Sequence, residues 1–410
     1  MSWRNHDLGL VERLAQEWLF ELLKGMGMLF LHPIFYYLFI LAAFFGVSRV
    51  KRERRNFHIR VENAYFELRQ LLPLGILIGL VMSVIIVGVG LVVPFAFIIL
   101  TAAITMLWGL TTKVRLLSPI YTVGFAFFAL IFMAGNDLSL PVFNEAFANL
   151  DESIFPGIAV ILTLFIIGEG VLIIKNGVKG TSPKLVKSKR GLNVGVHEVK
   201  RLWMVPVFLL IPGEAISLPF GWWPVFSIGG ESYSLILVPF AIGFFMQVQG
   251  LLPKEAIRHL GKRVIVLGSI LTVASVASYW APLVSIVVVA LAIIGREVLS
   301  YRQRMVEENL PFYFSKRNHG LMILGIIPDS PAFNMSLQVG EVISKVNGKT
   351  VYDEKLFYEA LQKNRAHCRL EVLDVNGEVR FVQRALYEGD HHELGILFVQ
   401  DENKWGNEAV

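Results

Sequence analysis

The sequence is poor in cysteine and in charged residues, and both shortages narrow the classes of protein that it can encode. Cys368 is the one cysteine in 410 residues, which excludes an intrachain disulfide framework and any multi-cysteine metal site. Charged residues make up 17% of the chain, against roughly 25% in ordinary soluble domains. The mean hydropathy is +0.57. We therefore do not expect a soluble enzyme.

The charge divides the chain into two unlike parts. Residues 1–299 hold 25 Lys and Arg against 17 Asp and Glu, whereas residues 300–410 hold 13 against 16. The first part is typical of a membrane domain, and the second is charged like a globular domain that is large enough to fold alone. Because the basic residues lie between apolar runs rather than on a folded basic domain, we do not expect nucleic-acid binding.

Apolar runs that could cross a bilayer recur through the first part. A spanning helix needs about 20 mostly apolar residues, so these runs predict six to nine spans. The longest two runs are divisible, because one can turn near Pro94 and the other can turn at residues 279–282 or form one tilted helix. The runs are Gly25–Val47, Leu72–Leu110, Ser118–Ala134, Ile154–Ile174, Trp203–Phe220, Ser234–Val248 and Val264–Gly295.

The loops between the runs predict the orientation. In a nine-span arrangement with the amino terminus outside, 22 of the 25 Lys and Arg residues in 1–299 fall in inner loops or directly after the last span. Segments 135–153 and 221–233, assigned outside, contain no Lys or Arg. Since short cytoplasmic loops retain Lys and Arg, this arrangement places the carboxy-terminal part in the cytoplasm.

The amino-terminal segment 1–24 allows a second arrangement. It could lie along the inner leaflet as an amphipathic helix, with His32-Pro33 marking a kinked or re-entrant first segment and both termini inside. Apolar residues recur in this segment at helical spacing beside charged ones. They are Leu8, Val11, Leu14, Trp18 and Leu22.

Two carboxylates lie inside the apolar runs, where a charge costs about 2.5–3.5 kcal/mol and is usually functional or faces the protein interior. Glu169 is close to the inner end of its run, so we expect its carboxylate to reach the lipid headgroups. Glu214 follows Pro212-Gly213, where a broken helix can line a cavity. For Glu214 a structural and a functional role stay equally open. Neither has an obvious intramembrane basic partner, so a proton or ion pathway has no support.

From His319 the sequence changes to short strands broken by turn residues. The pattern predicts strands at 320–327, 342–346, 368–375 and 378–385, with hairpin turns at Asn347-Gly348 and Asn376-Gly377. It also predicts a short helix after Pro328 and an amphipathic helix over 355–363. Together these elements predict a small α+β fold, a partly open β-barrel with two helices.

This order of elements is similar to the PDZ pattern. The resemblance rests on Pro-x-Ser-Pro-Ala, on apolar-x-x-Gly-Glu and on Val-Ile-x-x-Val-Asn-Gly. Glu341 stands where the pattern has Asp, and Asp329 where it has Gly. The resemblance implies that a peptide adds as an edge strand beside the second helix, while amides of an apolar-Gly-apolar loop hold its carboxylate.

Two positions for that loop stay open. One lies directly before the strand at 320–327, where Pro311 removes an amide that the loop needs. The other lies at the carboxy end, as in bacterial permuted domains, and we favour it. There the loop and the strand that follows are formed by Leu394, Gly395, Ile396, Leu397 and Phe398.

The second predicted helix would supply the other wall of the groove. Phe357 and Leu361 are the candidates, with Tyr358 as a further one, although each is explained at least as well as a core residue. Nearby, Asp390 and His391-His392 resemble a metal cluster, but we interpret them as a solvated loop.

No catalytic motif accompanies these parts. The string nearest to the zinc-protease motif HExxH begins at His197-Glu198, but it lacks the second His and lies in a basic loop. Neither a GxSxG serine motif nor a Walker A string is present. We therefore expect that the protein is not an enzyme and has no metal or cofactor.

The chain as a whole resembles the MinJ-type division-site topology proteins of Gram-positive rods. The resemblance rests on the opening LFLHPIFYYLFILAAFFG, on RVKRERRNFHIRVENAYFELR after it, on the multi-span middle and on the closing HHELGILFV. It implies a scaffold in the cell membrane, enriched at the septum and cell poles. Its partners would be the polar protein DivIVA, MinD and other divisome membrane proteins.

The expected fold class is thus a polytopic α-helical membrane domain followed by a small α+β PDZ domain. The divisions are an amphipathic segment (1–24), a multi-span domain (25–299), the PDZ domain (300–400) and a tail (401–410). Two other classes of function stay open. One is an accessory or regulator of a membrane protease, and the other is a transporter-like protein.

Overall fold

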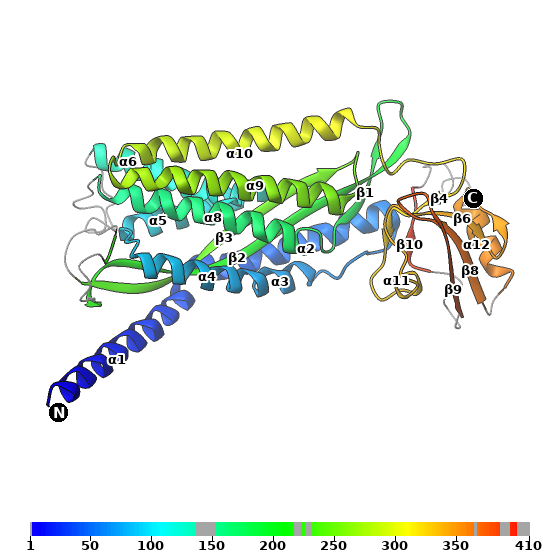
Figure 1. Ribbon diagram of the computed structural model, residues 1–410. Helices are drawn as coiled ribbons and strands as arrows, with labels where there is room; N and C mark the ends of the chain where they lie inside the picture. Colours follow the sequence, from blue (N-terminus) through cyan, green and yellow to red (C-terminus); the bar gives the residue numbers. More distant parts are fainter. Residues whose placement is uncertain are drawn as a thin grey trace.

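The computed structural model describes residues 2–136, 152–216, 223–225, 232–364, 367–385 and 394–399, with the backbone alone described at 2–15 and 214–216. An elongated bundle of helices surrounds a long β-hairpin, and a small carboxy-terminal domain lies at one end of the bundle (Figure 1). The amino-terminal helix projects from the opposite end.

The helices confirm several of the predicted breaks. Pro33 separates the first two helices, the turn near Pro94 separates α4 from α5, and residues 277–283 separate α9 from α10, which runs past residue 300. The helices are α1 (Ser2–Leu31), α2 (Pro33–Phe57), α3 (Phe66–Leu71), α4 (Pro73–Val89), α5 (Phe95–Leu110), α6 (Pro119–Gly135), α8 (Ile154–Asn176), α9 (Pro253–Val276) and α10 (Val284–Asn309).

Among the described residues, five helical segments are long and apolar enough to cross a membrane. Two shorter apolar helices, α5 and α6, accompany them. The five segments are Pro33–Phe57, Phe66–Val89, Ile154–Asn176, Pro253–Tyr279 and Val284–Asn309. By length and composition, the chain is therefore a membrane protein with several apolar helices.

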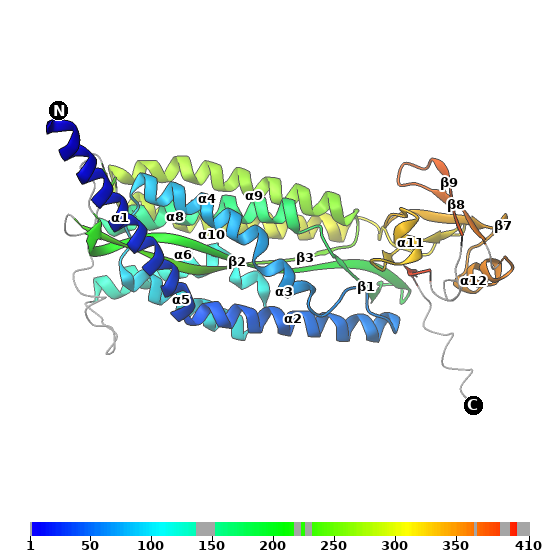
Figure 2. The same cartoon turned by 90° about the horizontal axis from the view of Figure 1, so that it is seen from below.

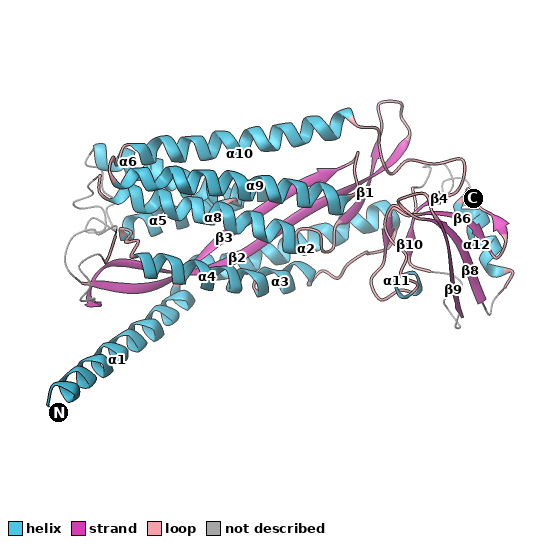
Figure 3. Ribbon diagram, in the orientation of Figure 1, coloured by secondary structure: helices cyan, strands magenta, loops and turns pink. Residues whose placement is uncertain are grey.

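Two runs that we expected to be helical spans are strands, so the prediction is wrong for both. The run Trp203–Phe220 falls in β2 (Asn193–Ile216) as far as it is described. The run Ser234–Val248 falls in β3 (Tyr233–Val248). With β1 (Ser182–Lys187) they form an antiparallel sheet in the order β1-β2-β3. Figure 2 shows the hairpin between α2 and α5 on one side and α8, α9 and α10 on the other, and Figure 3 shows the strands enclosed by helices.

Hydropathy cannot separate these strands from helices, because an apolar run buried on both faces has no distinguishing period. β3 has 16 residues, fewer than the roughly 20 of a spanning helix but more than the roughly 9–11 of a spanning strand. Pro206 and Pro239 lie inside the two runs and face each other across the hairpin. The carbonyl oxygen of Pro206 faces Gly79 of α4 rather than β3, so the two prolines occupy a pair whose backbone groups face outward. Their missing amide hydrogens therefore cost no ladder hydrogen bond.

The outer edge of β2 is closed by α4. A Cβ added at Gly79 would lie 2.1 Å from the carbonyl oxygen of Pro206, and Gly75 makes an equally close approach one turn earlier. Further along, Phe208 donates its amide to Ser83 Oγ at 2.8 Å. Because an apolar environment offers no water to satisfy a strand edge, these contacts are what allow the hairpin to be buried.

The carboxy-terminal domain follows the predicted pattern with one change. The turn at Asn347-Gly348 has positive φ at both residues (49° and 81°), as a type I′ hairpin requires. The strand expected over 320–327 is instead two short strands, because the chain changes partner at Leu324. The elements are β4 (Leu321–Met322), β5 (Gly325–Ile326), α11 (Pro331–Asn334), β6 (Val342–Val346), β7 (Lys349–Thr350), α12 (Glu354–Gln362), β8 (His367–Leu373), β9 (Val379–Ala385) and β10 (Ile396–Leu397).

These strands form two sheets. The larger has the order β4-β6-β8-β9 with β7 paired to β6, and the smaller pairs β10 with β5 in antiparallel fashion. The helix α12 begins at its cap Asp353, whose side chain accepts the amide of Lys355. One apolar core lies between the sheets and α12, and it includes Val346, Phe357 and Val372.

Candidate functional site

The strand β10 and the helix α12 bring the predicted groove residues together. The rings of Phe357 and Phe398 lie 5.2 Å apart, and Leu361, Leu394 and Ile396 belong to the same core. All five side chains are buried, with at most 4% of their surface exposed. The helix and the strand are thus packed against each other through these side chains.

Leu397 faces the other way, as alternation along a strand requires. It belongs to a separate apolar cluster with Met322 and Leu324, at the side of the domain that meets the helical bundle. Its carbonyl oxygen accepts the amide of Leu324 at 2.8 Å. The proposed groove strand is therefore also part of the contact with the rest of the chain.

Gly395 occupies a backbone conformation that a side chain would strain. Its φ is +79°, and an added Cβ would lie 2.3 Å from Cβ of Ser330. Its own carbonyl oxygen accepts the amide of Ile327 at 2.8 Å, and the carbonyl oxygen of Leu394 accepts the amide of Ala332 at 2.9 Å. The loop at 394–396 is thereby fixed against the segment that connects β5 to α11.

The segment before β4, the other position considered for the carboxylate loop, is joined to the sheet of β1, β2 and β3. Tyr313 donates its amide to the carbonyl oxygen of Gln249, and Gly195 donates its amide to that of Phe314, both at 2.8 Å. The backbone of this segment is therefore committed to contacts with β2 and with the end of β3.

His197 is the central polar residue of this junction. It lies in β2 rather than in the expected basic loop, and it is 1% exposed. Its Nε2 lies 2.9 Å from the carbonyl oxygen of Leu324, and its Nδ1 lies 3.0 Å from Thr181 Oγ1. Burial lowers its pKa to about 4, so the ring is neutral. A carbonyl oxygen only accepts, so Nε2 carries the hydrogen and Nδ1 accepts from the threonine.

An apolar layer completes the junction between the carboxy-terminal domain and the bundle. The ring of Phe314 lies 4.9 Å from that of His197. Around it, side chains from the end of α2, from β1 and from the carboxy-terminal domain form one cluster. Its buried members are Phe57, Val61, Phe314, Met322, Leu324, Val342 and Leu397.

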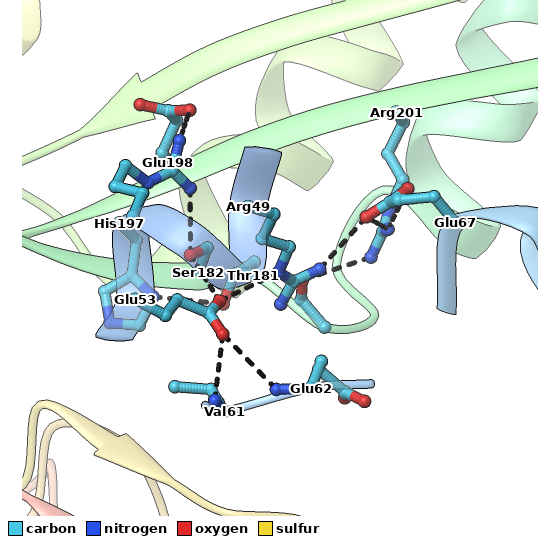
Figure 4. Close-up of polar contacts among 12 residues, drawn as sticks. Arg49, Glu53, Val61, Glu62, Glu67, Thr181, Ser182, His197, Glu198 and Arg201 are labelled. Carbon is cyan, nitrogen blue, oxygen red and sulfur yellow. Dashed lines mark hydrogen bonds and ion pairs between the residues drawn. The ribbon is translucent and has the colours of Figure 1, made fainter. Parts of the chain in front are cut away.

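A buried network of ion pairs lies next to His197, between α2, α3 and the strands β1 and β2 (Figure 4). Glu67 accepts two hydrogen bonds from Nη1 of Arg201, both at 2.8 Å, and one from Arg49 at 3.0 Å. Arg49 also binds Glu53 at 2.8 Å. At least nine-tenths of each of these residues is buried. Removing one partner from such a group leaves an unpaired buried charge, which costs about 3–5 kcal/mol.

Glu53 ties two segments of the chain to α2. Its carboxylate accepts the amide of Val61 at 2.8 Å and the hydroxyl of Ser182 at 2.7 Å. Arg52, one residue before it, forms an ion pair with Glu198 and donates to Ser182 at 2.9 Å. Sequence reasoning placed these residues in basic inner loops and missed the network, although the four-residue spacing of Arg49 and Glu53 was a visible signal.

Glu169 also has a partner, so two expectations about it are wrong. Its carboxylate is fully buried, pairs with Arg296 at 2.9 Å and accepts from Ser118 at 2.7 Å. It neither lacks a basic partner nor reaches the headgroups. The partners are 127 residues apart in sequence, a separation that residue pattern alone cannot bridge.

Glu214 lies in β2, so the broken helix expected at Pro212-Gly213 is wrong. The strand is irregular there, since Pro212 and Ile216 both pair with Tyr233. The side chain of Glu214 lies outside the described residues, as do Asp390 and His391-His392. Within the described part of the chain, no cluster of three His, Cys, Asp or Glu residues could hold a metal ion.

Comparison with known proteins decides the family. The chain is 42% identical over 398 residues to the cell division topological determinant MinJ of Bacillus subtilis (strain 168), covering 97% of this chain and 99% of that protein. The chain belongs to the MinJ family. A probable MinJ of Lacticaseibacillus paracasei is 24% identical over 88% of this chain and 94% of its own length. No protein-family model and no solved structure matches the chain.

Both parts of the chain lie within the match to the MinJ of Bacillus subtilis, because the aligned region covers nearly all of each protein. That relative is named as a division determinant rather than as an enzyme. The aligned region thus includes the long hairpin, the junction and the carboxy-terminal domain.

Proposed function

We propose that this protein is a membrane-anchored scaffold of division-site selection, enriched at the division septum and the cell poles. The observation that carries the proposal is the match along the whole length to proteins named as division topological determinants. The placement of Lys and Arg supports an orientation in which the carboxy-terminal domain faces the cytoplasm. From there it can recruit soluble and membrane-bound partners.

The carboxy-terminal domain acts in this proposal as a PDZ domain that binds peptide segments. Three features support this: β10 runs antiparallel to β5, α12 lies beside it through the contact of Phe357 with Phe398, and Gly395 has the left-handed conformation of a tight loop. A peptide would add along the side of β10 that is not paired with β5, and loop amides from Leu394 to Ile396 would hold its carboxylate.

The proposed partners are a DivIVA-type polar protein, MinD and other divisome membrane proteins. A scaffold needs separate surfaces for such partners, and the chain has two candidates: the peptide groove of the carboxy-terminal domain and the charged end of the bundle around Arg52 and Lys184. The buried pair of Glu169 and Arg296 is charge-balanced and fully packed. It supports a structural role for the bundle in this scaffold.

A localisation experiment tests the division function. A fluorescent fusion of the full chain should gather at septa and poles, and deletion of the gene should change cell length. A uniform membrane signal together with normal cell length after deletion would overturn the proposal.

A matched pair of glycine variants tests the groove. Gly395→Ala and Gly377→Ala both place a side chain at positive φ, but only at Gly395 does the added Cβ meet other atoms. In the full-length chain we expect Gly395→Ala to lose a groove-dependent partner in co-purification. Gly377→Ala should keep it, and both variants should insert into the membrane normally. Equal binding by the two variants would refute the assignment of the loop.

A further inference from the structure

A small pocket opens between α2, α3 and the first two strands, at the edge of the ion-pair network in Figure 4. Its room for the centres of water molecules is small, about 30 Å³, and its mouth is open to solvent. Its lining is dominated by charged and hydroxyl side chains. The residues are Phe45, Ser48, Arg49, Arg52, Glu67, Gly180, Ser182, Glu198 and Lys200.

The charges around the pocket do not balance. Three cationic side chains line the pocket against two carboxylates, so one positive charge is left over. The carboxylates are already engaged, since Glu67 is shared by two arginines and Glu198 by Arg52 and Lys184. The cations are Arg49, Arg52 and Lys200, and the carboxylates are Glu67 and Glu198.

Lys200 carries the unbalanced charge. It makes no ion pair with the described residues, and its Nζ lies 4.0 Å from the centre of the Phe45 ring. Burial lowers its pKa although Glu198 acts in the opposite direction. A half-buried ammonium held against an aromatic ring has lost water without gaining a carboxylate, so an anion at this position would stabilise it.

Arg49 adds a second donor that has no partner. The residue is 7% exposed, and its Nη2 is buried without a hydrogen-bond partner among the described residues. The other nitrogens of this guanidinium bind Glu53 and Glu67. Buried donors are paired in the great majority of cases, so an unpaired one in the wall of a pocket points to a ligand.

The position of the pocket along α2 narrows the class of ligand. The exposed side chains of Phe44 and Val47 are the last apolar ones before the charged stretch that begins at Arg49. Phe45 and Ser48 line the pocket at this same turn. It therefore lies at the level where the hydrocarbon of a bilayer gives way to phosphate groups, and basic pockets between helices at that level suit anionic headgroups.

We propose that this pocket binds a phosphate group, either the headgroup phosphate of an anionic phospholipid or free phosphate. Lys200 would donate to a phosphate oxygen, Ser48 would supply a hydroxyl, and the Arg49 guanidinium in the wall would add positive charge. This site is separate from the peptide groove, so its test does not depend on the function proposed for the carboxy-terminal domain.

The test compares three probes on the full-length chain in a non-ionic detergent, with the melting temperature as the readout. The probes are dioctanoylphosphatidylglycerol, dioctanoylglycerol, which has the same tails without phosphate, and inorganic phosphate. Lys200→Gln removes the proposed ligand contact, and Lys200→Arg keeps the charge. Lys184→Gln is the matched control, because Lys184 lies on the same sheet and pairs with Glu198 but does not line the pocket.

We expect dioctanoylphosphatidylglycerol to raise the melting temperature of the natural chain and dioctanoylglycerol to leave it unchanged. Stabilisation by inorganic phosphate alone would equally support the site and would identify a soluble phosphate as its source. Lys200→Gln should weaken the apparent affinity for the stabilising phosphate probe roughly tenfold, because one charge-assisted hydrogen bond is lost. Lys200→Arg and Lys184→Gln should bind nearly as the natural chain does. No stabilisation by either phosphate probe, or equal stabilisation in Lys200→Gln, would overturn the proposal.

Discussion

The contact of α4 with the buried hairpin yields a sharp prediction, because Gly79 touches the backbone of β2 directly. In Gly79→Ala, the new Cβ would start 2.1 Å from the carbonyl oxygen of Pro206, whereas real Cβ contacts almost never fall below 3.0 Å. The oxygen belongs to the backbone and cannot rotate away. The helix must therefore move outward by about 1 Å, and we expect the variant to be destabilised.

The size of the effect follows from what that movement loosens. Overpacking of this kind costs about 1–3 kcal/mol. The same shift would stretch the 2.8 Å hydrogen bond from Phe208 to Ser83 beyond its useful length, and that bond contributes about 1 kcal/mol. A total near 2–4 kcal/mol corresponds to a fall in melting temperature of about 3–6 °C for a domain of roughly 300 residues, because the unfolding entropy is about 2.1 cal/mol/K per residue.

Gly88→Ala is the matched control, because Gly88 lies in the same helix with no atom within 4 Å of an added Cβ. It should leave stability unchanged or raise it by up to about 1 kcal/mol, through helix propensity alone. The measurement is the melting temperature of each full-length chain in detergent, followed by size-exclusion chromatography of a fluorescent fusion. If Gly79→Ala has the same melting temperature as Gly88→Ala, the close contact between α4 and β2 is refuted.

Three further predictions test the junction and the core. Glu67→Gln leaves two buried guanidinium groups without their shared carboxylate, so stability should fall by about 3–5 kcal/mol; Glu371→Gln, in an exposed ion pair, should melt almost as the natural chain does. Because the pKa of His197 is lowered to about 4, the unfolded chain binds the proton more readily, and stability should decline as pH falls from about 6.5 towards 4. His197→Gln should lose that part of the pH dependence in melting curves. Burial raises the pKa of the Cys368 thiol to about 12, so at neutral pH maleimide should label it only after unfolding, and rapid labelling of the native chain would contradict this.

The sequence predicted the carboxy-terminal elements well because each had a local signal. The strand at 342–346 is bounded by turn residues and matches β6, and the helix predicted over 355–363 matches α12 within one residue at each end. The strand expected at 320–327 has no internal turn signal. Its division into β4 and β5 depends on two different partner strands, which only the assembled fold supplies.

The buried hairpin and the ion pairs were predicted poorly because their causes are distant in sequence. The apolar runs in β2 and β3 satisfy the length and hydropathy of a helix closely enough to be mistaken for one. Pro206 and Pro239 were the available signal, since two prolines inside apolar runs oppose a regular helix. Glu67 and Arg201 lie 134 residues apart, so their contact becomes visible only when α3 and β2 are placed side by side.

The junction fixes the carboxy-terminal domain rather than tethering it. A hydrogen-bonded path runs from β10 to β2. The carbonyl oxygen of Leu397 accepts the amide of Leu324, and the carbonyl oxygen of Leu324 lies 2.9 Å from Nε2 of His197 in β2. A tethered domain would take many orientations, whereas a docked one keeps a single orientation relative to the bundle. If the chain is the scaffold proposed above, this would lower the orientational cost of binding a second partner at the same end of the molecule. The buried charges next to His197 hold the sheet on which the carboxy-terminal domain is docked, and in the scaffold proposed above they would act through this rigidity.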